Sequence, residues 1–450
     1  MDIAAAIAYY DALLARDPAL AHESGSMLLT RQPGARLMFG SRPMCSCLRP
    51  QFIDAARYAA VSRICATLAA ATKRLEAALL SDEALLEVLD LSPDERHLVT
   101  IEPGYADAAA TTRLDSFVAG ESWQFVEYNA ESPAGIAYID TLSDLFRELP
   151  VMQAFEARYQ VRPLPARFTL LDTLLDAYRR WGGRNTPVIA IVDWQGLPTA
   201  SEFELFRELF HEQGHDTLIV DPCALEHHHG RLYAGDKPID LVYRRVLTHE
   251  LLARKDEAPA LLQAYEAGAV CMVNAFRCKL FHKKAIFAIL SDEANAHLFS
   301  AAEQQAIRLH IPWTRKVRDG YTTYDGRRVS LVDVVQAQRE RMVLKPNDEY
   351  GGKGVVLGWE VDAATWEQAL AHALQSSYVV QERVETARTR YPVFQDGSVQ
   401  TVEFTTDLDP FLFGTQVTGL LTRVSPSSLL NVTAGTASTI PTFVVEDRDQ

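Results

Sequence analysis

The spacing of apolar residues predicts a helical beginning for this chain. Within residues 1–100, apolar positions recur every three or four residues in IDAARYAAVSRICATLAAATKRLEAALL and continue in SDEALLEVL, a period typical of amphipathic helices. Segment 27–50, MLLTRQPGARLMFGSRPMCSCLRP, interrupts this pattern with Pro and Gly residues. A loop of this length is usually functional. We therefore treat 27–50 as a candidate substrate loop, in which Arg42, Cys45 and Arg49 would cap an acceptor site.

From residue 97 onward the pattern changes to that of strands. HLVTIEPG (97–104) predicts a strand, and residues 111–129, TTRLDSFVAGESWQFVEYN, predict a β-hairpin that turns at VAGES. The helical pattern IDTLSDLFREL follows. PVIAIVDW, SEFELFRELFHEQG and HDTLIVDP then read as strand, helix and strand, an order that predicts a small parallel sheet.

The rest of the chain, from residue 248 onward, begins with helices and ends with strands. Residues 248–310 have a helical pattern, apart from VCMVNAFR, and the segment after 340 reads as strand, Gly-rich turn, strand, helix and several further strands. We therefore predict a mixed α+β and α/β fold in six parts: a helical region (1–100), a β-hairpin part (101–165), a small α/β domain (166–247), a helical part (248–340), a lid (341–390) and C-terminal strands (391–450).

Composition narrows the class of protein. A chain of 450 residues can form two or three compact units. A formal net charge of -15 argues against general binding to nucleic acid or to a lipid surface, because such binding needs clustered Lys and Arg. The N-terminal sequence lacks the pattern of a signal peptide, and no apolar run approaches the ~20 residues of a membrane helix. We expect a cytoplasmic protein with no membrane partner.

The Cys and His residues do not predict a metal site. Six cysteines in a long chain of this kind are expected to be reduced thiols. Cys45 and Cys47 lack the spacing of a zinc site. Three consecutive histidines, 227–229, point to alternate faces of an extended chain, and we expect a solvated loop there.

The stretch MVLKPNDEYGGKGVVLGWE, residues 342–360, predicts a phosphate-binding lid. Lys345 ends an apolar strand, and the glycines at 351, 352 and 354 can adopt the positive φ that lets backbone N–H groups approach phosphate oxygens. Lys353 would lie at the mobile tip. The motif is not GxxxxGK[ST], and no helix follows the glycines directly. An ordinary glycine-bearing hairpin turn is the alternative.

A strand some twenty residues later predicts the adenine side of the same pocket. In SSYVVQERVE, main-chain groups and the side chain of Gln381 or Glu382 can meet the base and its exocyclic amine. The alternative is an exposed edge strand that carries charges against aggregation.

The hairpin at 111–129 predicts the metal ligands. Glu127 and Asn129 are separated by one residue and share a face of the second strand, and Asp115 lies on the first strand. Carboxylate and amide oxygens are the ligands of Mg2+. Arg113, two residues before Asp115, would hold the γ-phosphate or the transferring phosphoryl group. Exposed polar strand positions are the alternative for each residue taken singly.

Together, the lysine strand, the GGKG lid, the Gln-Glu strand and the E-x-N pair resemble the ATP-grasp superfamily. The metal hairpin precedes the lid by some 220 residues. This order is similar to that of circularly permuted ATP-grasp proteins, specifically the synthetase region of the glutathionylspermidine synthetases. WQFVEYNAESPAGI and VLKPNDEYGGKGV carry the resemblance most specifically. It implies an ATP-grasp fold in permuted order, with the helical N-terminal region and the small parallel-sheet domain added.

The resemblance implies roles for individual residues. It implies a catalytic, phosphate-binding role for Arg113 and two Mg2+ ions held by Asp115, Glu127 and Asn129. It also implies ATP contacts for a group of residues near the lid and the Gln-Glu strand: Lys345, Gly351, Gly352, Lys353, Gly354, Gln381, Glu382 and either Lys283 or Lys284, with Lys284 preferred.

The sequence also departs from the glutathionylspermidine synthetases. No amidase region with a Cys-His pair precedes the resemblance, so hydrolysis of the product is not expected. The family's substrate positions align with Glu131, Ser132 and Ala134. Ser132 can orient a substrate carboxylate, whereas the Ala134 side chain cannot form a hydrogen bond, which argues against glutathione itself.

The C-terminal segment adds further candidates. Arg423, Asn431 and the turn at 433–436 offer a guanidinium, an amide and backbone donors that suit a substrate or an acyl phosphate. A plain sheet with a loop is the alternative reading of this segment.

The implied activity is an ATP-dependent carboxylate-amine ligase that releases ADP and phosphate. Its substrates would be a small-molecule carboxylate and an amine, amino-acid-like or peptide-like. Two alternatives stay open: a nucleotide-binding protein without ligase activity, and a kinase that phosphorylates a small molecule. The sequence also leaves a homodimer open.

Overall fold

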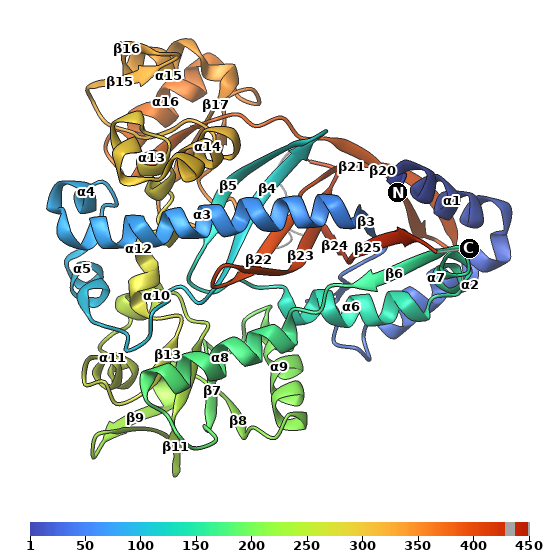
Figure 1. Cartoon of the computed structure of the whole chain (residues 1–450), viewed down its shortest axis with the longest axis horizontal. Coiled ribbons are helices and arrows are strands. Elements are labelled where there is room, and N and C mark those ends of the chain that lie inside the picture. Colours follow the sequence, from blue (N-terminus) through green and yellow to red (C-terminus); the bar gives the residue numbers. More distant parts are fainter. Residues whose placement is uncertain (428–436, 449–450) are drawn as a thin grey trace.

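A central antiparallel sheet connects the lobes of the molecule (Figure 1). The computed structural model describes residues 1–427 and 437–448. The strand order is β20-β21-β23-β22-β4-β5, with β24 paired to β23. Helix α3 (Ala55–Ser81) crosses one face of this sheet. The strands are β4 (Thr111–Ala119), β5 (Ser122–Asn129), β20 (Arg388–Gln395), β21 (Ser398–Thr406), β22 (Asp409–Phe413), β23 (Gln416–Ser425) and β24 (Ser438–Ile440).

The lower lobe in Figure 1 is the predicted small α/β domain. Its sheet has the order β13-β12-β7-β8 and is parallel throughout, which confirms the predicted parallel sheet. The strands are β7 (Ile189–Val192), β8 (Thr217–Val220), β12 (Leu241–Arg244), β13 (Cys271–Val273) and, in a small meander, β9 (Leu225–His228), β10 (Arg231–Ala234) and β11 (Lys237–Ile239). The helices are α8 (Arg167–Trp181), α9 (Ala200–Glu212), α10 (Thr248–Ala253) and α11 (Pro259–Glu266).

The upper lobe is built on the antiparallel sheet β14-β19-β17-β18. Strands β17 and β18 flank the Gly-rich stretch, as predicted, and β19 lies between β14 and β17. Because β19 is an inner strand, the edge-strand alternative is wrong. The strands are β14 (Thr314–Lys316), β15 (Tyr321–Tyr324), β16 (Arg327–Ser330), β17 (Met342–Pro346), β18 (Val356–Leu357) and β19 (Tyr378–Glu382). The helices are α13 (Ala285–Leu290), α14 (Ala301–His310), α15 (Leu331–Ala337) and α16 (Ala363–Ala373).

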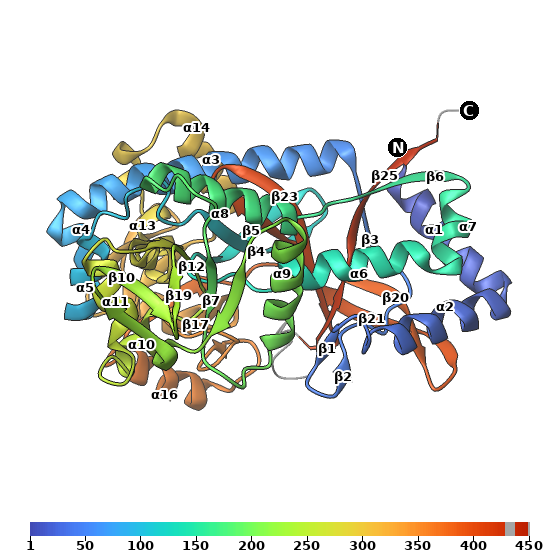
Figure 2. The same ribbon diagram turned by 90° about the horizontal axis from the view of Figure 1, so that it is seen from below.

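The lobe at the right of Figure 1 brings both ends of the chain together. Strand β25 pairs with β3 in parallel and with β6 in antiparallel orientation, and Figure 2 shows α1, α6 and α7 beside this small sheet. The elements are α1 (Ile3–Arg16), α2 (Pro18–Arg31), α6 (Ile136–Glu148), α7 (Pro150–Glu156), β1 (Met38–Phe39), β2 (Arg42–Pro43), β3 (Gln51–Asp54), β6 (Tyr159–Pro163) and β25 (Thr442–Asp447).

Three predictions of local structure were wrong. Residues 27–31 complete helix α2, so the candidate loop begins at residue 32. HLVTIEPG is no strand, because Pro93 opens helix α5 (Pro93–Thr100) and Ser92 and Glu95 form a capping box. The predicted boundaries of the parts 166–247 and 248–340 separate strands that belong to one sheet. Strand β13 pairs with β12 across the first boundary, and β14 pairs with β19 across the second.

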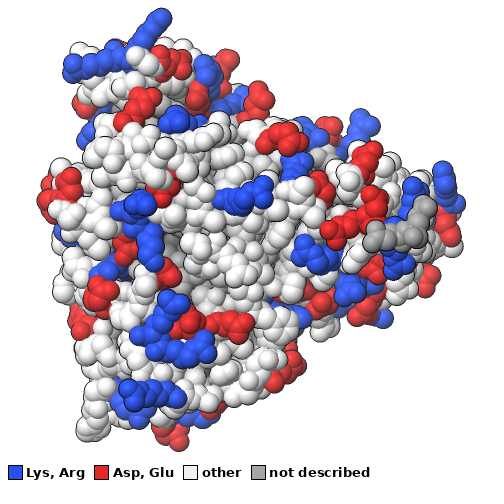
Figure 3. Space-filling model, in the orientation of Figure 1, with Lys and Arg blue, Asp and Glu red and all other residues white. Residues whose placement is uncertain are grey.

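Two further observations concern the surface. Among the described residues, no helix combines the length and the apolar character needed to cross a membrane. On the face shown in Figure 3, Lys and Arg side chains alternate with Asp and Glu side chains along the rim, and the central area carries few charges.

Candidate active site

One cavity gathers most of the predicted site residues. Its volume is about 500 Å3, and it lies where the hairpin β4–β5, the upper lobe and the lower lobe meet. The predicted residues that line it are Arg113, Asp115, Glu127, Asn129, Ser132, Lys284, Lys345, Gly351, Gly352, Gln381, Glu382 and Arg423. The two halves of the predicted site, far apart in sequence, therefore form one cavity.

The hairpin holds its polar residues in register. Asp115 pairs with Glu127 and Arg113 pairs with Asn129, so the four side chains share one face, as predicted. The register shifts just after Asp115, which leaves Val126 unpaired as a bulge. The carbonyl of Val126 accepts a hydrogen bond from Lys345 Nζ at 3.2 Å. The bulge thus links the hairpin directly to the lid strand β17.

Asp115 lies between two guanidinium groups. Arg113 donates to both of its carboxylate oxygens, at 2.7 and 3.1 Å, and Arg423 donates to Oδ2 at 2.7 Å. Asn129 Nδ2 donates to Oδ1 at 2.8 Å. Burial opposes ionisation, but Arg113 and Arg423 together lower the pKa of Asp115 to about 2. The carboxylate is therefore charged at neutral pH.

Two carboxylates that the sequence analysis missed complete this cluster. Arg423 contacts Asp407 Oδ2 at 2.6 Å and Asp409 Oδ2 at 2.9 Å. Burial raises the pKa of Asp409, and the neighbouring Asp115 and Asp407 raise it further. The signal was present as DLDP, an acid-x-acid spacing at the start of β22 that places both side chains on one face.

Lys284, rather than Lys283, reaches the cavity. Its Nζ lies 2.9 Å from Glu127 Oε1 and donates to the carbonyl of Glu349 at 2.5 Å. Burial opposes ionisation of Glu127, but Lys284 lowers its pKa below the usual value. Lys283 instead contacts Glu95 and Asp348. The ammonium of Lys284 therefore links the hairpin β4–β5 to the Gly-rich loop.

Lys345 is held at the end of β17 as expected. Its Nζ donates to Gln381 Oε1 at 2.6 Å, and burial lowers the pKa of Lys345 to about 8. The amide nitrogen of Gln381, Nε2, donates to Thr314 Oγ1 at 3.0 Å. Glu382 accepts a hydrogen bond from Tyr324 at 3.1 Å. Gln381 thus has protein partners for both polar atoms of its amide, whereas Tyr324 bonds only Oε1 of Glu382. The adenine contacts of these two side chains stay predictions.

The glycines of the lid have the predicted backbone conformation. Gly351, Gly352 and Gly354 have φ values of 65°, 75° and 72°, a region that favours glycine. Gly351 and Gly352 line the cavity. Lys353 is exposed, and its Nζ lies 3.2 Å from Glu349 Oε1. An ordinary hairpin turn and a phosphate-binding lid would both have this backbone geometry. The ATP contacts of Lys353 and Gly354 therefore stay predictions.

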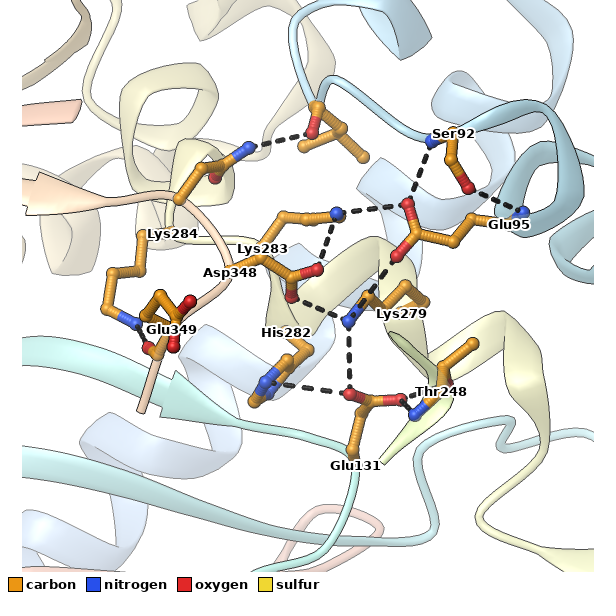
Figure 4. A network of polar contacts seen from close by, with 12 residues as sticks. Ser92, Glu95, Glu131, Thr248, Lys279, His282, Lys283, Lys284, Asp348 and Glu349 are labelled. Carbon is orange, nitrogen blue, oxygen red and sulfur yellow. Dashed lines mark hydrogen bonds and ion pairs between the residues drawn. The ribbon is translucent and has the colours of Figure 1, made fainter. Parts of the chain in front are cut away.

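A buried polar network fixes the base of the lid (Figure 4). Asp348, in the loop after β17, accepts hydrogen bonds from Lys279 at 2.6 Å and from Lys283 at 2.7 Å. Both lysines also contact Glu95, at 3.5 and 3.0 Å. Lys279 belongs to the short helix α12 (Lys279–His282). The lid loop is thereby anchored to α12 and α5, away from its glycines.

Glu131 is the acidic centre of this network. It is fully buried, and it contacts Lys279 at 3.2 Å, Arg244 at 3.3 Å and the backbone N–H of Thr248 at 3.1 Å. Burial opposes its ionisation, but Lys279 leads the cations that lower the pKa of Glu131 well below its usual value. The resemblance aligned Glu131 with a substrate position. In this structure the side chain holds the hairpin to the lower lobe instead.

Replacing Glu131 by Gln is expected to lower the free energy of unfolding by about 3 kcal/mol. Arg244 would keep its buried charge without a counter-ion, and Lys279 would keep only Asp348 and Glu95. Since the pKa of Glu131 is lowered on folding, the contribution is present at neutral pH and is lost as the pH falls below ~4. Urea denaturation at pH 7 and at a series of pH values below about 4 measures both effects. Glu121→Gln, in the exposed turn of the same hairpin, is the matched control, and equal stability of the two variants would contradict this expectation.

The N-terminal loop reaches the cavity through residues other than those predicted. Phe39 and Met44 line it. Cys45 is buried, and the Arg49 guanidinium lies 4.6 Å from the ring centre of Tyr391. Arg42 donates to the carbonyl of Ala437 at 3.1 Å. The loop therefore borders the site, but Cys45 and Arg49 serve its packing. Asn431 and residues 433–436 lie outside the described residues.

The three predicted magnesium ligands supply only some of the oxygen atoms that a hard cation needs. Asp115 and Glu127 have lowered pKa values and supply charged oxygens, and Asn129 adds an amide. Among the residues that the structure describes, no group of three or more His, Cys, Asp or Glu side chains is placed to hold a metal ion. Mg2+ commonly takes phosphate oxygens as its remaining ligands, so the residues fit an ion that arrives with a nucleotide. The magnesium site stays a prediction.

Comparison with curated proteins finds distant relatives. A putative glutamate–cysteine ligase of Frankia alni is 27% identical over 364 residues, which cover 77% of this chain and 39% of the relative. An uncharacterised protein of Synechocystis sp. is 23% identical over 255 residues, 52% of this chain and 47% of that protein. The chain thus spans less than half the length of either relative.

Comparison with solved structures supports the fold. A glutathione synthetase-like effector of Globodera pallida, solved without ligand, superposes with a TM-score of 0.65 at 12% identity, covering 95% of this chain and 98% of the effector. At this identity the likeness concerns the fold alone. Together with a family profile that matches residues 95–425, this likeness confirms the expected ATP-grasp fold in permuted order. The narrower resemblance to the glutathionylspermidine synthetases is not confirmed.

The profile of one protein family matches residues 95–425, a span that includes the hairpin β4–β5, the Gly-rich loop and Arg423. This match covers well over half of the sequence. The chain therefore belongs to the circularly permuted ATP-grasp type 2 family.

Proposed function

We propose that the protein is an ATP- and Mg2+-dependent ligase that joins a carboxylate to an amine through an acyl phosphate and releases ADP and phosphate. The observation that supports this most is the convergence of Lys345, Lys284, Arg113 and Arg423 with ionised carboxylates in one cavity beside a Gly-rich loop. Cations suit the phosphates, and the fixed carboxylates suit metal ions.

The upper lobe would bind the nucleotide. The ammonium groups of Lys345 and Lys284 attract the phosphates, and the positive φ of Gly351 and Gly352 lets loop N–H groups approach them. The base would lie against β19 and the following residues 383 and 384, which line the cavity. Two Mg2+ ions, held by Asp115, Glu127 and Asn129, would neutralise charge on the β- and γ-phosphates when bound.

The central sheet would hold the reacting groups. An oxygen of the substrate carboxylate attacks the γ-phosphorus, and ADP leaves. The amine nitrogen then attacks the acyl carbon, the C–O bond to phosphate breaks, and the nitrogen loses a proton. Arg113 and Arg423, fixed by Asp115, would stabilise charge on the transferring phosphoryl group, and Ser132 would orient the carboxylate.

The substrates would be small molecules. The Frankia alni relative is named a putative glutamate–cysteine ligase, which supports an amino-acid-like or peptide-like carboxylate for this chain. A cytoplasmic location and a homodimer stay predictions.

The products of ATP test this proposal. The purified protein, incubated with ATP, Mg2+ and a panel of carboxylates and amines, is expected to release ADP and phosphate only when both substrates are present. Release of AMP and pyrophosphate would contradict the acyl-phosphate route. A stable phosphorylated product, detected by mass spectrometry, would indicate the kinase, and tight ATP binding without ADP release would indicate the inactive nucleotide-binding protein.

The lowered pKa of Lys345 predicts a pH dependence. Below pH 8 the side chain is an ammonium that attracts phosphate, and above pH 8 it becomes neutral in the free protein. Because kcat/KM reports groups of the free enzyme, kcat/KM for ATP is expected to decrease as the pH rises above about 8. A profile from pH 6.5 to 9.5 measures this, and a value that stays constant to pH 9.5 would contradict it.

A further inference from the structure

The part of the cavity formed by the lower lobe carries two carboxylates that the phosphate chemistry does not use. Asp193 directly follows β7, and Glu250 lies in α10, shortly after β12. Strands β7 and β12 are parallel neighbours. Their carboxyl ends therefore open on the same edge of the sheet, the place where open α/β sheets bind ligands. Lys345 and Lys284, the proposed phosphate-binding cations, belong to other elements of the cavity wall.

Asp193 lacks a partner for one of its oxygens. The residue is only 9% exposed, yet it lines the cavity. Its Oδ1 accepts a hydrogen bond from the backbone N–H of Trp194 at 2.9 Å. Within residues 1–427 and 437–448, Oδ2 has no hydrogen-bond or ion-pair partner. Burial raises the pKa of Asp193 to about 6. The Oδ2 atom is not sealed inside the protein, because it is not among the fully buried atoms without a partner, and the residue lines the cavity. A carboxylate that is nine-tenths buried and has one unpaired oxygen open to a cavity suits a hydrogen-bond donor from a ligand.

The nearest cation is already committed to other groups. Arg245 follows β12 and donates to the carbonyl of Pro133 at 2.8 Å and to the hydroxyl of Tyr243 at 2.9 Å. Its remaining terminal nitrogen lies 3.3 Å from Glu202, and its Nε is buried without a hydrogen-bond partner among the described residues. This corner of the cavity therefore keeps an acidic character. Tyr350, from the loop after β17, donates to Glu250 at 3.2 Å and links the Gly-rich loop to this corner.

Apolar side chains lie next to these carboxylates. Leu197 and Pro198 come from the loop that begins at Asp193, and Leu247 directly precedes α10. Tyr138, whose hydroxyl lies 3.5 Å from the carbonyl of Thr199, continues this wall. Met44 packs in the same hydrophobic cluster as Tyr138. The wall suits a hydrocarbon group, because it offers apolar contact area beside the acidic corner.

We propose that this corner binds the amine substrate as an alkylammonium ion that has an apolar group and no carboxylate next to the nitrogen. Asp193 and Glu250 hold the ammonium, and the wall formed by Leu197, Pro198, Leu247 and Tyr138 holds the hydrocarbon group. A carboxylate on the adjacent carbon would face the same two acidic side chains, with Arg245 already paired. This inference rests on the proposed ligase function, since it assigns the amine of that reaction.

Calorimetric titration of the full chain without nucleotide tests the inference. Two pairs of probes are used, and within each pair the amine and the amino acid carry the same hydrocarbon group. These pairs are 3-methylbutylamine with leucine, and phenethylamine with phenylalanine. Each amine is expected to bind at least ~10-fold more tightly than its amino acid. The inference is overturned if either amino acid binds as tightly as its amine, or if neither amine binds at about 10 mM.

Variants identify the carboxylates in the same titration. Asp193→Asn and Glu250→Gln are each expected to weaken amine binding at least ~10-fold, because each removes a charge-assisted hydrogen bond. Glu212→Gln, which removes one exposed charge from α9 of the same lobe, is expected to leave binding unchanged. Unaltered binding in both cavity variants, with thermal unfolding like that of the parent, would overturn the assignment. Because no turnover is needed, a failure of the ligase proposal shows separately, as absence of ADP release.

Discussion

Replacing Glu127 by Gln is expected to lower kcat at least ~100-fold while leaving the fold intact. The substitution keeps the shape of the side chain but removes the charge that faces Lys284 at 2.9 Å and that would hold Mg2+. The lowered pKa of Glu127 shows that this charge is present at neutral pH. Steady-state release of ADP at saturating substrates measures the loss.

The control for Glu127→Gln lies in the same hairpin. Glu121 occupies the exposed turn between β4 and β5, so Glu121→Gln makes the same chemical change about six residues away without touching the cavity. We expect its kcat to stay within about twofold of the parent. Full turnover by Glu127→Gln would show that the hairpin does not hold the metal, and the proposed mechanism would have to be abandoned.

Replacing Lys345 by Met is expected to raise KM for ATP by about 10- to 100-fold, since a charge-assisted hydrogen bond to phosphate contributes about 1.5–3 kcal/mol. Met keeps the length of the side chain and much of its packing. The variant loses the ammonium that contacts Gln381 and the carbonyl of Val126. In the Lys345→Met variant, kcat/KM for ATP should no longer decrease above pH 8, because the group that titrates has been removed. Initial rates at varied ATP concentration measure both effects.

Lys353→Met provides the matched comparison. Lys353 lies eight residues further along the same motif, but its side chain is exposed and pairs with Glu349. If the lid keeps this arrangement when ATP binds, KM should rise less than about threefold, as expected for an exposed pair. An equal loss in the two variants would mean that the lid closes further over the phosphates than it does in this structure.

Local pattern was enough to find the two halves of the site. Alternation in the strands placed Glu127 and Asn129 on one face, and three glycines marked the positive φ of the lid, because both are properties of a few neighbouring residues. The helix α5 was mistaken for a strand for the same reason. Its apolar residues fit either period, and the Ser92–Glu95 capping box decided the outcome.

Contacts between segments that are distant in sequence could not be predicted from the pattern of a few neighbouring residues. The bulge at Val126 and its hydrogen bond with Lys345 depend on how the central sheet meets the lid strand. The burial of Glu131 depends on cations supplied by α12 and by β12. Likewise, the choice of Lys284 over Lys283 follows from which face of the chain turns toward the cavity.

By itself, the sequence determined which residue types were available: a lysine strand, a glycine lid and a hairpin with acidic and amide oxygens. Only the tertiary structure decided that Asp407 and Asp409 join Asp115 around Arg423, and that Asp193 and Glu250 line the same cavity. The physical reason is that hydrogen-bond geometry within a strand acts over a few residues, whereas charges are brought together by the packing of whole sheets.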